Sequence, residues 1–266
     1  MDINLSKEKP IVRLRAFRAV DDPLTCERFI EGHTHVLTSI GITKVTSSKN
    51  DWMYNPAAFV LVVESLDGEK VFGGARVHVA GGNQPLPIES ATCALDPKIY
   101  DLVWQYGQHG TGELCGLWNS REIAGYGIGS IFLIRAAVAI SYQIGIQSLF
   151  ALCAPYTIKP GEAVGMELEP TVGNDGTFYY PKLDLLATTM VLKDVPTLSK
   201  AHEEDKAAIL KIRENLKIIR NEVLRKKEVE IHYEIEIPLL NEWSLEDTIS
   251  NAYENLLKVK ESSSLT

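Results

Sequence analysis

A turn rich in glycine, Ala124-Gly125-Tyr126-Gly127-Ile128-Gly129-Ser130, joins an apolar strand pattern to the start of an apolar helix pattern. Glycines let the backbone approach a ligand closely, and the unpaired amides at a helix start favour an anion. The chemistry indicated is the binding of a phosphate by backbone amides. A glycine turn before a helix is also a common structural device, so the turn taken alone favours a tight loop over a ligand site.

Other phosphate and hydrolase motifs do not fit the chain. No Gly-Lys-Ser/Thr ending follows the turn, which excludes a nucleotide P-loop, and the spacing G-x-G-x-G differs from the dinucleotide-binding G-x-G-x-x-G. The strand–helix–strand pattern around the turn occurs once, whereas a dinucleotide-binding fold repeats it. There is no G-x-S-x-G elbow and no evident histidine partner for a cysteine, which makes a hydrolase the least favoured enzyme class.

Composition narrows the classes further. The chain has 266 residues, 45% of them hydrophobic, which is enough for one sizeable core, and its net charge of −8 argues against binding to nucleic acid. The longest apolar stretch, residues 128–140, contains Arg135 and is too short to span a bilayer. We therefore expect a cytoplasmic protein without a membrane span. None of the four cysteines has C-x-x-C spacing, so we expect their thiols to be reduced. They are Cys26, Cys93, Cys115 and Cys153.

Hydrophobic periodicity predicts the elements that position the turn. A strand over 11–20 precedes a helix that ends near Gly41, and strands over 57–65 and 71–80 form a hairpin. A short helix follows, from Asp96 to Gln108. The turn itself lies between a strand over 112–120 and a helix that runs to Ser141, and a further strand over 146–154 completes a unit whose two strands are expected to be parallel.

Charged helix patterns dominate the C-terminal part of the sequence. We therefore divide the whole chain into a domain over 1–195 and an extension over 196–266. The apolar positions Ile209, Ile212, Leu216, Ile219 and Val223 predict one helix over about 200–227. We expect this apolar seam to pack on the chain's own body, with a homodimer seam as the alternative. A strand over 228–237 and a helix over 245–259 follow.

The segment LWNSREIAGYGIGSIFL resembles the acetyl-coenzyme A motif of the GNAT N-acyltransferase superfamily, and the order of elements is similar too. The resemblance implies an α+β fold, an α/β/α sandwich with a mixed, mostly antiparallel sheet, a central splayed pair of parallel strands and a C-terminal helical extension. There are two departures. Ala124 stands where the family has Arg or Gln, and Gly161 stands where many members have a tyrosine acid. The positions that match the motif are Leu117, Ser120, Glu122, Gly125, Gly127, Ile128 and Gly129.

A narrower resemblance is to acyl-homoserine-lactone synthases and N-acyl amino acid synthases. Their paired signatures are a Gly-x-x-Arg strand that runs into a Pro-bearing loop, and Glu-x-Ser-Arg on the next strand. Arg76 and Glu113 match these signatures, while Cys115 replaces the serine and Gly116 replaces the arginine.

The resemblance implies transfer of an acyl group from acetyl-CoA, another acyl-CoA or an acyl carrier protein to the amine of a small molecule, without a metal. Glu113 is the candidate base and Tyr156 is the candidate acid. The alternative for Glu113 is a structural role as the ion-pair partner of Arg76, and the alternative for Tyr156 is a buried structural tyrosine. Arg76 and His78 are candidates for acceptor binding. The candidate donor-binding residues are Leu117, Trp118, Asn119, Ala124, Gly125, Tyr126, Gly127, Ile128, Gly129 and Ser130. For Trp118 the alternatives are a wall of the acyl-chain pocket and the core, and the core is favoured. The rival function is a binding module of the same fold without catalysis.

Overall fold

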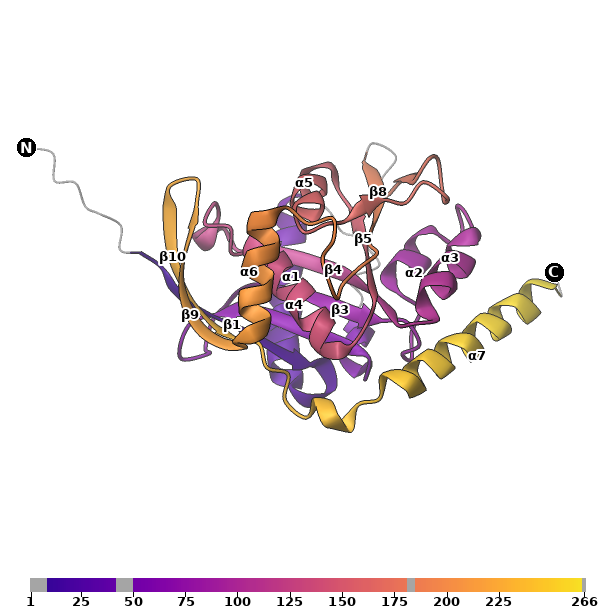
Figure 1. Ribbon diagram of the computed structural model, residues 1–266, viewed down its shortest axis with the longest axis horizontal. Coiled ribbons are helices and arrows are strands. Elements are labelled where there is room, and N and C mark those ends of the chain that lie inside the picture. Colours follow the sequence, from indigo (N-terminus) through magenta and orange to yellow (C-terminus); the bar gives the residue numbers. More distant parts are fainter. Residues whose placement is uncertain (1–8, 42–49, 181–184, 265–266) are drawn as a thin grey trace, which may run out of the picture.

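The computed structural model describes residues 9–41, 50–180 and 185–264, with side chains as far as residue 261. Its strands form one sheet in the order β6-β8-β5-β4-β3-β2-β1-β10-β9, and β7 also pairs with β8 (Figure 1). The strands are β1 (Ile11–Arg18), β2 (Ala58–Glu64), β3 (Val71–Val79), β4 (Thr111–Asn119), β5 (Ser148–Cys153), β6 (Glu167–Leu168), β7 (Thr177–Tyr179), β8 (Leu186–Leu192), β9 (Lys217–Leu224) and β10 (Lys227–Glu234).

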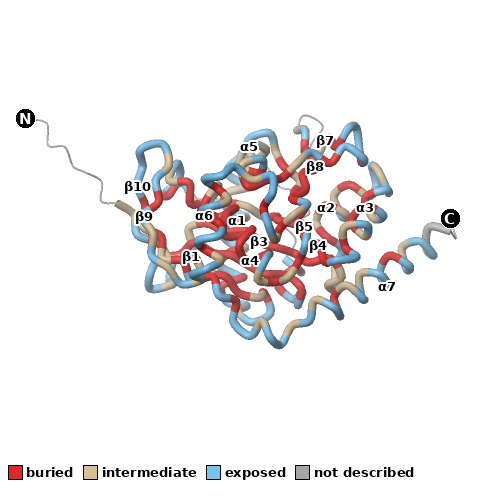
Figure 2. The backbone as a smooth tube through the Cα atoms, in the orientation of Figure 1, coloured by how far each residue is buried: buried red, intermediate tan, exposed pale blue. Residues whose placement is uncertain are grey.

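Helices cover both faces of this sheet, which confirms the predicted α+β sandwich. One face carries α4, with α6 packed against it, and the other carries α1 over β3 and β4, with α2 and α3 further along. Buried residues concentrate in the central strands and in α4 (Figure 2). The helices are α1 (Pro23–Ser39), α2 (Pro87–Thr92), α3 (Lys98–Gly107), α4 (Ile131–Ile144), α5 (Pro155–Ala163), α6 (Glu203–Glu214) and α7 (Leu245–Ser264). Within the described part of the chain, no helix is both long and apolar enough to cross a membrane.

The central parallel pair, β4 and β5, is splayed as predicted. Its paired positions are Thr111 with Ser148, Gly112 with Leu149 and Glu113 with Phe150. Beyond Glu113 the two strands run on without pairing to each other, while β4 stays paired with β3 as far as Asn119. The strands therefore part in the middle of the sheet, and the gap is held open by their outer neighbours.

The predicted helix over 200–227 is wrong in its second half. The helix ends at Glu214, and β9 follows as one arm of an antiparallel hairpin with β10, which lies parallel to β1. Ile209 and Ile212 are buried as expected, but Ile219 is 62% exposed and Val223 58%. Backbone pairing with β10 has overridden the helical spacing of the apolar residues. No single helical seam exists here for a dimer, and the domain boundary at residue 195 stays a prediction, although β10 extends the same sheet.

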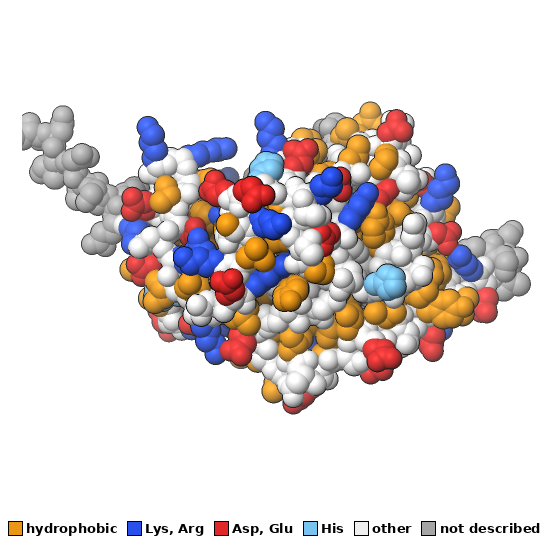
Figure 3. All heavy atoms as spheres, viewed as in Figure 1, with side chains coloured by type: hydrophobic (Ala, Val, Ile, Leu, Met, Phe, Trp, Pro, Cys, Tyr) orange, Lys and Arg blue, Asp and Glu red, His pale blue; other side chains and the backbone are white. Residues whose placement is uncertain are grey.

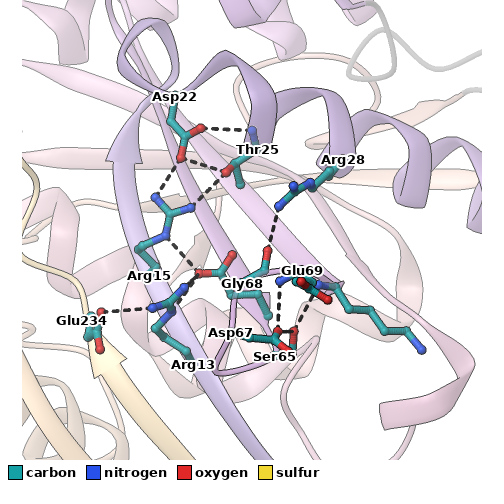
Figure 4. A network of polar contacts seen from close by, with 12 residues as sticks. Arg13, Arg15, Asp22, Thr25, Arg28, Ser65, Asp67, Gly68, Glu69 and Glu234 are labelled. Atoms are coloured by element: carbon teal, nitrogen blue, oxygen red, sulfur yellow. Dashed lines mark hydrogen bonds and ion pairs between the residues drawn. The ribbon is translucent and has the colours of Figure 1, made fainter.

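A buried carboxylate ties β1 to β2 on the face that carries α1 (Figure 4). The Glu64 side chain is 1% exposed, and its Oε1 accepts from Arg13 Nε at 2.9 Å and from Arg15 Nε at 3.0 Å. Arg15 also forms an ion pair with Asp22, with Nη1 and Oδ2 2.9 Å apart. Asp22 is the N-cap residue of α1, and its Oδ1 accepts a hydrogen bond from the Thr25 amide at 3.1 Å. This chain of contacts fixes the start of α1 against the sheet.

Glu64→Gln should lower the free energy of unfolding by about 2 kcal/mol, because it removes the charge that two partly buried arginines share. Urea denaturation would measure the change. Glu122→Gln is the matched control, since Glu122 forms an ion pair with Lys70 in which both side chains are more than half exposed, and its loss should have little effect. Equal effects of the two substitutions would contradict this assignment.

Candidate active site

The gap between β4 and β5 contains a cavity of about 200 Å³, which we call the slot. Its walls come from both faces of the sheet, with Ile134 of α4 on one side and His33 of α1 on the other. The two strands contribute Glu113 to Leu117 and Ala151 to Cys153, and α5 closes one end. The slot therefore passes through the sheet at the point where backbone pairing stops.

Glu113 lies at the last position of β4 that pairs with β5, at the base of the slot. Its side chain is buried, and its Oε2 accepts a hydrogen bond from the Ile88 amide of α2 at 2.6 Å. Burial raises the pKa of Glu113 to about 8, the Ile88 bond opposes the rise, and the nearby Glu89 adds to it. A carboxyl group that titrates near neutral pH suits proton transfer.

Arg76 and His78 lie beside Glu113, on the neighbouring strand β3. His78 is directly opposite Glu113 in the strand register, and Arg76 is opposite Cys115. Both side chains are buried, and the Arg76 guanidinium carbon lies 4.2 Å from the centre of the Trp52 ring. Burial, together with the charge of Arg76, lowers the pKa of His78 well below its usual value. The two candidate acceptor residues thus share one buried region with the candidate base.

His33 of α1 is a further residue of this site, and it is not among the candidate site residues drawn from the sequence. It is 5% exposed, lines the slot, and stacks on Trp118 with ring centres 6.4 Å apart. Burial lowers the pKa of His33 to about 4, so the imidazole is neutral at physiological pH. His35, two positions on, is exposed, as expected for a different helix face. Spacing alone does not indicate which of two helical histidines faces a slot.

The remaining strand candidates divide between the slot and the core. Leu117 lines the slot, whereas Trp118 is buried on the α1 side against Phe29 and Gly32. Tyr156, at the start of α5, lines the slot and is 77% exposed, so the alternative of a buried structural tyrosine is wrong. Gly161 is buried in the same helix and also lines the slot.

The glycine turn forms the approach to α4, as predicted. Gly125 has φ +83° and Gly127 has φ +79°, a left-handed backbone that favours glycine. Gly129 packs so closely on Asn119 that a Cβ atom would lie 2.1 Å from the Asn119 Cβ. Helix α4 then begins at Ile131 with Ser130 as its N-cap residue. Asn119 therefore supports the turn by packing against it.

The tip of the β9–β10 hairpin lies over this turn, an arrangement that sequence reasoning missed. Lys227 Nζ is 3.4 Å from the Ala124 carbonyl oxygen and 4.7 Å from the centre of the Tyr126 ring. The tip also carries Arg225 and Lys226, both at positive φ. Lys and Arg side chains project at the end of the hairpin in Figure 3. About a hundred residues separate Lys227 from the turn, and no local pattern indicates the contact.

In the residues that the structure describes, no group of histidine, cysteine and acidic side chains is arranged to hold a metal ion. The four cysteines form no disulfide, and burial raises the pKa of Cys115 to about 12 and that of Cys153 to about 11. Both thiols line the slot as neutral, apolar groups.

The fold is shared with solved acyltransferase structures. FeeM, an N-acyl amino acid synthase from uncultured soil microbes, is 15% identical, with a TM-score of 0.52 over 71% of this chain and 94% of that one. MesI, a CoA-dependent acyl-homoserine lactone synthase, is 15% identical, with a TM-score of 0.51 over 80% and 99%. BjaI, another such synthase, solved with SAM and isopentyl-CoA, is 11% identical, with a TM-score of 0.50 over 91% and 99%. No family model and no curated protein matches the sequence.

The raised pKa of Glu113 has a consequence for stability. The pKa of this carboxyl group is higher in the folded state than in the unfolded state, so between about pH 4.5 and about pH 8 the folded state binds the proton and the unfolded state does not. The free energy of unfolding therefore falls as the pH rises through this range. Glu113→Gln should remove this dependence, because glutamine keeps an oxygen for the Ile88 amide and has no proton to lose. Urea denaturation of the wild type and of Glu113→Gln at pH 5, 6.5 and 8 tests this prediction. A stability difference that is constant with pH would contradict a raised pKa.

Proposed function

We propose that the protein is an N-acyltransferase that moves an acyl group from acyl-CoA to the amine of a small molecule. The observation that carries the proposal is the slot, which opens where β4 and β5 part and has a buried carboxyl group at its base. Solved structures of the same fold belong to enzymes that form an amide from an acyl donor and an amine. Two of them are described as CoA-dependent, which favours CoA over a carrier protein as the donor.

The donor's pantetheine arm is proposed to lie in the slot along β4 beyond Glu113. There the edge of β4 that faces β5 has no strand partner, so the amide groups of the arm can bind it as an added strand. The same backbone supplies an N–H near the thioester carbonyl, where it would stabilise the oxyanion that forms on attack. Leu117 and Ala151 provide apolar walls for the arm and the acyl chain.

Glu113 is the proposed base. In its ionised form it takes a proton from the amine as the nitrogen attacks the thioester carbonyl, a C–N bond forms and the C–S bond breaks. Tyr156, at the exposed mouth of the slot, is the proposed acid that protonates the leaving thiolate. The products are an amide and free CoA. The neutral imidazole of His33 lines the same slot and is proposed to accept a hydrogen bond from the acceptor.

The phosphates of the donor are proposed to lie at the glycine turn before α4. Ala124 cannot supply the side-chain contact that Arg or Gln gives elsewhere in the superfamily. Lys227, from the hairpin tip, places a cation on that turn and is the proposed substitute. Arg76 and His78 lie beside Glu113 on the neighbouring strand β3 and are proposed to bind the acceptor; amino acids are the first acceptors to screen.

The rate should follow the titration of Glu113. Because its carboxylate form is the base and burial raises its pKa to about 8, kcat/KM should increase with pH and level off above about 8. Glu113→Gln should reduce kcat/KM by about 100-fold or more and remove the increase of kcat/KM with pH. Release of CoA, followed with a thiol reagent from pH 6 to 9, gives the profile. An unchanged profile in the variant would exclude Glu113 as the base.

Lys227→Ala should weaken acyl-CoA binding by about tenfold, the effect of losing one charged phosphate contact of about 1.4 kcal/mol. Binding of the corresponding acyl-pantetheine, which lacks the nucleotide phosphates, should not change. Lys211→Ala, on the exposed side of α6, alters the net charge equally and is the control. Isothermal titration calorimetry distinguishes the cases. An equal loss for both donors would show that Lys227 acts on the fold and makes no phosphate contact.

A further inference from the structure

A second cavity, of about 280 Å³, lies between α3 and α7. Its walls come from the segment 80–85, from α2, and from facing sides of the two longer helices. No residue lines both this cavity and the slot. It is therefore a separate space, which the proposed acyl transfer does not use.

Helix α7 is a fixed wall of this cavity, held by contacts at several points along its length. Gly81 has φ +102°, and a Cβ atom there would lie 1.8 Å from the Thr248 carbonyl oxygen, so α7 rests directly on this glycine. Further along, the Trp104 and Tyr253 rings pack with centres 5.2 Å apart. Lys260 Nζ lies 2.6 Å from Asp101 Oδ1. The long helix at the lower right of Figure 1 is thus packed against α3.

The lining combines apolar walls with one acidic side chain and the amide side chains of Asn83, Gln84 and Asn255. Aromatic surface comes from Tyr100 and Trp104 of α3, and aliphatic surface comes from Val103 and from Leu256 of α7. Glu89 of α2 is the only acidic residue among the lining residues. The basic residue of the lining, Lys258, is on the exposed side of α7. Asn83 and Asn255 are exposed, so the aromatic and aliphatic walls and the one carboxyl group favour a ligand that is apolar over most of its surface and carries one donor group.

The surroundings of Glu89 leave this carboxyl group available to a ligand. Its Oε2 accepts from the Leu86 amide at 2.7 Å, and in the described residues no basic side chain forms an ion pair with it. Burial raises the pKa of Glu89 to about 7, against the effect of the Leu86 bond. A cation beside the second oxygen would favour the ionised form, and aromatic walls also attract cations.

We propose that the cavity between α3 and α7 is a binding site for a small primary amine with an aromatic or branched apolar body. The ammonium group binds the Glu89 carboxylate, and the apolar body lies against Trp104 and Leu256. This site does not depend on the proposed acyl transfer, since it shares no lining residue with the slot.

Phenethylamine is a suitable probe, with 2-phenylethanol as its uncharged counterpart. Each would be titrated into the full chain while the indole N–H resonance of Trp104 is followed by NMR. The wild type should bind the amine saturably, and Glu89→Gln should weaken this binding at least tenfold while binding the alcohol as before. Glutamine retains an oxygen for the Leu86 amide, so the turn is preserved. Glu254→Gln, an acidic residue of α7 outside this lining, should bind the amine like the wild type.

A second variant locates the probe independently of charge. Ala252→Leu adds volume to the α7 wall and should weaken the amine and the alcohol alike. The proposal is overturned if the Trp104 resonance does not respond to millimolar amine in the wild type, or if Glu89→Gln binds the amine as tightly as the wild type does. A response to the amine that Ala252→Leu leaves unchanged would place the ligand elsewhere, and it would overturn the proposal as well.

Discussion

Everything at the candidate site depends on the point where β4 and β5 stop pairing. Each strand keeps its outer neighbour, β3 for β4 and β8 for β5, so neither can move across to close the gap. Helix α4 connects the two strands and is buried along most of its length, which fixes their separation from one face. The result is a backbone edge inside the protein that lacks a strand partner. Such an edge favours a ligand that can hydrogen-bond like a strand.

Burial then sets the protonation states around this gap. The pKa of Glu113 is raised, while those of His33 and His78 are lowered, in each case chiefly because the charged form loses solvent. Arg76 is buried in the same region and lowers the pKa of both histidines. A site with neutral imidazoles and a carboxyl group that titrates near neutral pH can accept a proton without a metal ion.

Local patterns predicted the centre of the molecule better than its ends. The unit around Gly127 could be predicted, because its two strands and its apolar helix have distinct hydrophobic periodicities and because glycines mark the turn between them. Helix α2 escaped notice, since six residues are too few for a helical pattern, although its Ile88 amide binds Glu113. Strand β9 was misread because its apolar residues also fit helical spacing. The contact of Lys227 with the turn depends on tertiary pairing that no local pattern contains.

Hydrogen exchange of the backbone amides along β4 tests the central claim most directly. If the acyl donor binds in the gap as an added strand, acyl-CoA should slow exchange in segment 115–119 and in the facing end of β5, while β1 and β2 remain unchanged. Binding that is confirmed by calorimetry but leaves these amides exchanging at their free rate would contradict the account, because the donor would then occupy some other surface.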